Sequence, residues 1–220
     1  MPQDTLETIA ADVRACPNCR LCEKRTKAVP GEGSPNSEIM FIGEGPGYHE
    51  DQQGRPFVGA AGQLLNDMLR HVGLRREEVF ITNVVRCRPP GNRDPQPDEL
   101  SACDEYTLRQ IGVLRPKVIV TLGRYSMARF FGPGGAMTRM HGTSRTWNGI
   151  ACIAMYHPAF ILRAQTPQMM RTYQEDFEKI VALLEQVKRQ PKATPPAEAA
   201  PAPVASRPKE DPQLDQLRLF

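Results

Sequence analysis

Short apolar runs alternate with amphipathic helical patterns along most of the chain, and this alternation constrains the fold more than any other feature. Helical periodicity lies between or after these runs at residues 60–72, 97–114 and 167–187. Such an order is typical of a mostly parallel sheet with helices on both faces. The apolar runs, which we expect to be strands, are residues 39–42, 79–83, 118–122 and 150–155.

Two local signals refine this pattern. Asp4 directly precedes the first helical pattern, so we expect it to cap that helix. Residues 143–147 and 150–155 flank Asn148-Gly149, a dipeptide that favours a two-residue hairpin turn. The fourth strand is therefore expected to pair with the segment before it.

The expected strands also indicate where a site would lie. In open parallel α/β sheets, ligands bind beyond the carboxyl ends of the strands. The chain places chemically active side chains directly after each expected strand. We therefore expect one site built from Gly43–Phe57, Asn83, Gly123–Arg124 and His157.

The first of these segments reads GEGPGYHEDQQGRPFVG and is rich in glycine. It lacks the Gly-Lys-Ser/Thr ending of a P-loop, and a proline stands where a phosphate-binding amide would be needed. Glycine lets a backbone approach a ligand closely. A ligand pocket is therefore a better interpretation than a phosphate loop.

Composition limits the class of protein. The 220 residues carry a net charge of +3, with 40% hydrophobic and 24% charged residues, which is ordinary for a soluble protein. No apolar run is long enough to span a membrane, and the N-terminus lacks a secretory signal pattern. We expect a cytoplasmic protein whose six cysteines do not form structural disulfides.

Four cysteines are candidate metal ligands. Cys16 and Cys19 are two residues apart and can grip one metal from a single turn, whereas Cys87 and Cys103 are too far apart for an ordinary zinc ribbon. A 4Fe–4S cluster also needs four thiolates but tolerates wide spacing. Spacing alone leaves zinc and iron–sulfur open. Cys152 lies in an apolar strand and is expected in the core, and Cys22 is a spare thiol near the ligands.

The C-terminal part differs in composition from the rest. Prolines and alanines dominate residues 191–212, so this segment is expected to be a disordered linker. Apolar residues return in the last segment, 213–220. We therefore expect a catalytic domain over 1–190, a linker and a short C-terminal peptide.

Several segments together resemble the family 4 uracil-DNA glycosylases, the iron–sulfur type. The resemblance rests on Cys-x2-Cys at Cys16, GEGPG and ED-x2-G-x-PFVG-x-AG within 43–62, TNVVRCRPPGNRDPQPDE at 82–99, Cys103, and HPAFILR at 157–163. It implies an α/β fold, a three-layer α/β/α sandwich with a four-stranded, mostly parallel sheet. It also implies a structural 4Fe–4S cluster on Cys16, Cys19, Cys87 and Cys103.

The family's activity would be hydrolysis of the N-glycosidic bond of deoxyuridine in single- or double-stranded DNA, releasing uracil and leaving an abasic site. The protein would act as a monomer in the bacterial cytoplasm, in the first step of base excision repair. The target base must leave the stack and enter a pocket.

The resemblance assigns roles within that pocket. His157 would donate to uracil O2, and the Asn83 amide would pair with N3–H and O4. Phe57 would stack on the base, and Glu50 would shape the pocket near C5. The backbone of Gly43, Glu44 and Gly45 would line it.

The attacking water lacks an obvious base. Gly45 stands where a better-known uracil glycosylase family has an aspartate that orients the water. Glu44 is adjacent and is our candidate second catalytic residue beside His157.

The segment after His157 is expected to meet DNA. Among its apolar residues Leu162 is a candidate wedge, and Arg163 and Arg88 are candidate phosphate contacts. Further candidate phosphate contacts are Arg86, Arg93 and Arg124.

The chain ends in QLRLF, which resembles the pentapeptide that docks on the bacterial sliding clamp. Two apolar anchors on a tether suit capture in a groove. The candidate clamp-binding residues are Gln216, Leu217, Leu219 and Phe220.

Two other functions compete with this one. A histidine-crosslinking relative that binds uracil-DNA would carry a histidine between Asn83 and Cys103, where this chain has none. A non-catalytic iron–sulfur module that recruits a partner to DNA would not need Asn83 and His157.

Overall fold

The computed structural model describes residues 4–189. The expected linker at 191–212 and the clamp-docking peptide at 213–220 lie outside the described residues. All described residues lie within the expected catalytic domain, 1–190.

The centre of the fold is a six-stranded sheet in the order β1-β3-β2-β4-β6-β5. Its four middle strands are parallel, and the two edge strands are antiparallel to their neighbours. The middle strands are β3 (Phe80–Asn83), β2 (Ile39–Gly43), β4 (Val118–Leu122) and β6 (Ile150–Met155), and the edges are β1 (Glu32–Gly33) and β5 (Ser144–Trp147). The four expected strands are thus confirmed as the parallel part of a larger sheet.

The two edge strands have different origins. The β5–β6 hairpin matches the sequence expectation, and both Asn148 and Gly149 adopt positive φ, at 46° and 80°. Positive φ at both turn residues is what a type I′ turn requires. Strand β1 was not predicted, because two residues are too few to show a periodic pattern.

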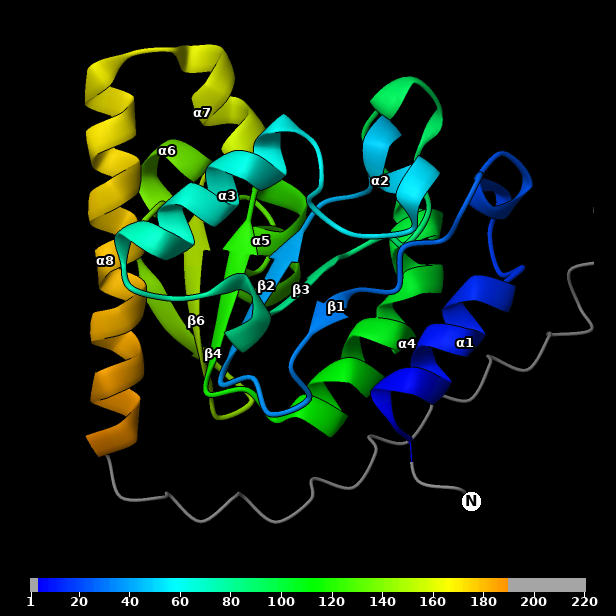
Figure 1. Ribbon diagram of the computed structural model, residues 1–220, viewed down its shortest axis with the longest axis horizontal. Coiled ribbons are helices and arrows are strands. Elements are labelled where there is room, and N and C mark those ends of the chain that lie inside the picture. Colours follow the sequence, from blue (N-terminus) through cyan, green and yellow to red (C-terminus); the bar gives the residue numbers. More distant parts are fainter. Residues whose placement is uncertain (1–3, 190–220) are drawn as a thin grey trace, which may run out of the picture.

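Helices cover both faces of the sheet (Figure 1). Alternate residues of β2 show why: Ile39 and Phe41 join one apolar cluster, and Met40 and Ile42 join the other. The first cluster includes residues of α3 (Ala60–His71), α7 (Pro158–Ala164) and α8 (Pro167–Arg189). The second includes α4 (Pro97–Leu114) and α5 (Arg124–Phe131), with α1 (Leu6–Ala15) packed outside α4. The three-layer α/β/α sandwich is confirmed.

The expected cap of α1 is wrong. Thr5, not Asp4, caps the helix: its Oγ1 accepts from the Thr8 amide at 3.2 Å, and Thr8 Oγ1 accepts from the Thr5 amide at 2.9 Å. Asp4 instead forms an ion pair with Arg109 of α4. The short helices were not predicted either, since they lie in loop-like sequence; they are α2 (Tyr48–Gln53), α6 (Met137–Met140), η1 (Arg20–Glu23), η2 (Arg76–Glu78) and η3 (Pro90–Asn92).

Within residues 4–189, no helix is long and apolar enough to cross a membrane.

Candidate active site and cysteine pocket

A cavity of about 360 Å³ opens at the carboxyl edge of the parallel strands. It brings together the loop after β2, the end of β3 and the turn between β6 and α7, as the strand order predicts. Lining residues from these segments include Glu44, Gly45, Glu50, Phe57, Asn83 and His157. Six of the seven residues expected in a uracil pocket therefore share one cavity.

The seventh, Gly43, is not among the residues that line the cavity, and its backbone contact with uracil stays a prediction. Gly43 lies behind the wall, where a Cβ atom would collide with Asn83 Oδ1 and lie 2.6 Å from the ring of Phe57. Its lack of a side chain lets both groups occupy their positions. Gly43 thus supports the wall of the cavity without forming part of it.

Asn83 ends β3 and pairs in register with Gly43 of β2. The side chain is 1% exposed, and Oδ1 is one of the few buried polar side-chain atoms without a partner within residues 4–189. A buried amide oxygen without a hydrogen bond is costly. Because Asn83 also lines the cavity, a ligand that reaches its amide can supply the missing donor.

Glu50 anchors the glycine-rich loop. One carboxylate oxygen accepts from the amides of Val58 and Gly59 at 2.8 and 2.9 Å, and the other accepts from the Gly47 amide at 3.1 Å. These charge-assisted bonds join the first turn of α2 to the start of α3. Glu50 therefore fixes the shape of the cavity wall through the backbone.

Phe57 adopts a left-handed conformation with φ of 51°, which is unfavourable for a residue with a side chain. Arg76 holds it there by donating to the carbonyls of Phe57 at 3.2 Å and Pro56 at 2.6 Å. Gly62 makes room, because any side chain there would collide with the Phe57 carbonyl. The buried ring stacks on His157 with centroids 5.6 Å apart. The strained backbone thus holds the Phe57 ring in the wall of the cavity.

His157 is the N-cap of α7, and its Nδ1 accepts from the Ala159 amide at 3.1 Å. Pro158 has no N–H, so Ala159 supplies the first free amide of the helix. Burial lowers the pKa of His157 to about 4, with a smaller contribution from Arg163. The neutral ring with Nδ1 as acceptor carries its proton on Nε2. The local fold therefore makes His157 a neutral Nε2–H donor.

Glu44 lines the cavity and is held from the opposite side. Its Oε1 accepts from the Tyr125 amide in the first turn of α5 at 3.1 Å, and its carboxylate fills the space beside Gly123. Burial raises the pKa of Glu44, and the amides of Tyr125 and Arg124 oppose the shift. A carboxylate with a raised pKa at a cavity wall is suited to accept a proton.

Three residues expected to contact DNA lie close to the cavity. Arg163 lines the cavity, and Leu162 is 36% exposed next to it in sequence. Arg88 stands over the ring of Tyr48 at 5.3 Å and donates to Asn92 at 2.8 Å. Arg163 therefore lines the cavity, and Leu162 and Arg88 adjoin residues that line it.

Two other arginines are engaged elsewhere. Arg93 lines the cavity but forms a two-bond ion pair with buried Glu99, and Arg124 pairs with Asp94. No local pattern in the sequence indicated that the loop at 89–95, which carries Arg93, covers the cavity. The structure folds it over the cavity, so that it contributes Pro89, Asn92, Arg93, Asp94 and Pro95 to the lining.

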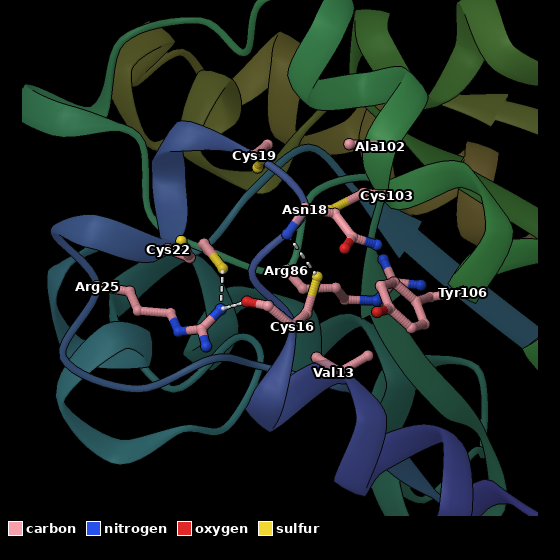
Figure 2. A pocket seen from close by; sticks show the side chains of 11 residues that line it. Val13, Cys16, Asn18, Cys19, Cys22, Arg25, Arg86, Ala102, Cys103 and Tyr106 are labelled. Carbon is pink, nitrogen blue, oxygen red and sulfur yellow. Dashed lines mark hydrogen bonds between the residues drawn. The ribbon is translucent and has the colours of Figure 1, made fainter.

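The second site is a pocket between α1, η1 and α4 (Figure 2). All four expected cysteine ligands line it, and so does Cys22. In residues 4–189, no group of three or more Cys, His, Asp or Glu is arranged to hold a metal ion. The sulfur atoms are nevertheless gathered from three distant parts of the sequence. Cys152 is fully buried in β6, as expected.

Arg86 lines the same pocket, and the expectation that it contacts phosphate is wrong. It is 1% exposed and is the largest fully buried side chain of the described residues. Burial lowers its pKa to about 10, so it stays charged at neutral pH. A second arginine, Arg25, donates to Cys87 Sγ at 3.3 Å. Thiol donors beside buried positive charge suit an anionic iron–sulfur cluster, so the residues of this pocket fit such a group.

Comparison with known proteins defines the class. A sequence model of the uracil DNA glycosylase superfamily matches residues 30–184, most of the chain. Similar proteins include the type-4 uracil-DNA glycosylases of Sulfurisphaera tokodaii, 50% identical over 80% of this chain and 84% of the relative, and Archaeoglobus fulgidus, 44% identical over 80% and 92%. That of Thermotoga maritima is 43% identical over 80% and 93%. The chain belongs to the type-4 uracil-DNA glycosylases, hydrolytic enzymes of DNA repair that excise uracil.

Proposed function

We propose that this cavity binds a uracil flipped out of DNA and that its residues break the bond between uracil and deoxyribose. One observation carries the proposal: Asn83, whose Oδ1 has no partner within residues 4–189, and the neutral His157 line the same cavity. An acceptor and a donor on one wall suit the polar edge of a pyrimidine.

Asn83 would distinguish uracil from cytosine. Its Oδ1 would accept from uracil N3–H, and its NH2 group would donate to O4. Cytosine has an acceptor at N3 and an amino group at C4, so both pairings would fail. The walls at Glu50 and Phe57 would hold the ring in plane, with Phe57 stacking on its face.

His157 would stabilise the departing base. When the C1′–N1 bond breaks, its electron pair goes to uracil, and negative charge develops on O2. A fixed Nε2–H donor near that oxygen lowers the barrier without protonating the base. Water then adds to C1′ and loses a proton, which leaves an abasic deoxyribose, and the uracil anion takes up a proton from solvent to give free uracil.

Glu44 would take the proton of that water. Gly45 has no side chain with which to orient it, and Glu44 is the adjacent carboxylate on the cavity wall. The Tyr125 amide donates to Oε1 of Glu44, which leaves Oε2 as the oxygen that would accept the proton. Leu162 would fill the gap left by the flipped base, and Arg163 and Arg88 would contact phosphates on either side of it.

Cys16, Cys19, Cys87 and Cys103 would hold a 4Fe–4S cluster. When bound, the cluster would cross-link α1, the segment after β3 and α4, and so stabilise this side of the domain. The thiols and the buried arginine charge support this assignment. Iron and acid-labile sulfide analysis of anaerobically purified protein tests it, and equimolar zinc without iron would contradict it.

The C-terminal peptide would dock the enzyme on a bacterial sliding clamp through Gln216, Leu217, Leu219 and Phe220, with 191–212 as tether. A monomer tethered in this way would act where DNA is being copied in the cytoplasm. Pull-down with purified clamp tests this, and binding that survives deletion of residues 216–220 would refute it.

Cleavage of a uracil-containing oligonucleotide, followed by alkaline scission of abasic sites, tests the main proposal. Asn83→Asp should lose uracil excision and gain weak activity on cytosine, because the acid can present a donor to N3. An unchanged uracil rate would remove Asn83 from the site. A denaturation-resistant protein–DNA adduct would instead favour the crosslinking relative, and binding without cleavage would favour a recruitment module.

A further inference from the structure

The side chain of Arg86 has donors that no group within residues 4–189 satisfies. Its Nη2 donates to Thr107 Oγ1 at 3.1 Å and to Gln110 Oε1 at 2.8 Å, both neutral acceptors on α4. Its Nε and Nη1 are buried and unpartnered within residues 4–189. A fully buried guanidinium is normally paired with an anion.

No carboxylate of the described residues forms an ion pair with Arg86. The nearby Asp104 is already bound by Arg129, whose Nη2 donates to it at 3.0 Å. The pocket that Arg86 lines instead holds five cysteines, including Cys87, the next residue along the chain, and Cys103 on α4. Figure 2 shows Arg86 among these side chains, extending toward Cys103 and Tyr106.

We propose that Arg86 is the buried counter-charge of the iron–sulfur cluster, placed to stabilise its negative charge and to raise its reduction potential. Four thiolates outweigh the positive charge of the iron–sulfur core, so the bound group is an anion. One added electron makes it more negative, and a fixed cation therefore favours the reduced form. This inference rests on the cluster proposed above.

Arg25 is a second arginine in the cysteine pocket, and its effect on the cluster can be compared with that of Arg86. It donates to Cys87 Sγ at 3.3 Å but is only partly buried, so water screens its charge. A second comparison is Arg76, a mostly buried arginine whose charge is neutralised by Glu32 at 2.7 Å. Arg76 does not line the cysteine pocket.

The test uses full-length protein purified without oxygen, and wild type is measured first. Wild type without iron and sulfide would overturn the cluster proposal itself. With the cluster present, Arg86→Met should lose it to a ferrous chelator at least tenfold faster. Its midpoint potential in dithionite titrations followed by absorbance should shift negative. Arg25→Met should show smaller shifts in the same direction, and Arg76→Met should melt earlier with an unchanged potential.

Arg86→Lys separates charge from packing, because it keeps the positive charge but not the fork that binds Thr107 and Gln110. It should hold the cluster with a potential closer to wild type than that of Arg86→Met. If Arg86→Met is not recovered folded, Arg86→Lys should be, with cluster bound. Loss of both variants alike, or a wild-type potential and chelation rate in Arg86→Met, would overturn the proposal.

Discussion

His157 allows a test in which activity and stability are predicted from the same contact. His157→Asn removes the Nε2–H donor from the cavity, and loss of one such donor lowers the rate of the chemical step about 10²–10³-fold. The low pKa of about 4, against an ordinary 6.5, also affects stability. Below pH 6.5 the unfolded chain takes up a proton that the folded chain refuses until about pH 4.

The contribution of His157 to stability is present above pH 6.5 and is lost as the pH falls toward 4. Between pH 7 and pH 5 the loss is about 2 kcal/mol, because each pH unit inside the window is worth about 1.4 kcal/mol. His157→Asn cannot titrate, so its free energy of unfolding should fall by about 2 kcal/mol less than that of wild type over this range.

Urea denaturation at pH 7 and pH 5 measures the stability difference, and single-turnover cleavage of a uracil oligonucleotide measures the rate. Because His157 stays neutral down to about pH 4, the wild-type cleavage rate should show no inflection near pH 6.5 that depends on His157. His71 on α3, at the surface beside Glu178, is the control: His71→Asn should cleave like wild type. A wild-type minus His157→Asn stability difference that is the same at both pH values would refute the reasoning.

Three further predictions concern the cavity. Gly43→Ala should fold but lose most activity, because the new methyl displaces Asn83 and the Phe57 ring; circular dichroism with a cleavage assay would show it, and full activity would contradict it. Glu44→Gln should slow single-turnover cleavage about 10²-fold. It should also abolish the fall in rate at low pH, which in wild type begins above the ordinary range of a glutamate because burial raises the pKa. Glu50→Ala should lower the free energy of unfolding by about 3 kcal/mol, since three amides lose a charged acceptor, and a stability change near zero in urea would argue against that role.

Much of the fold was readable from the sequence because its signals are local. Strand and helix periods located the four parallel strands, and Asn148-Gly149 located the hairpin. The rule that sites lie beyond strand ends places Glu44, Asn83 and His157 together from the sequence alone. The strand β1 was not predicted, because it is too short to show such a local pattern.

What only the tertiary structure decided depends on contacts between distant residues. The tautomer of His157, the supporting position of Gly43 and the strained backbone of Phe57 held by Arg76 are set by neighbours that no local pattern names. Arg86 shows this most clearly. As an arginine in a basic loop it suggested a phosphate contact, and the fold instead buries it among cysteines. The sequence by itself determined which chemical groups are present and in which order along the sheet. Burial, which sets their charge state and their partners, came only from packing.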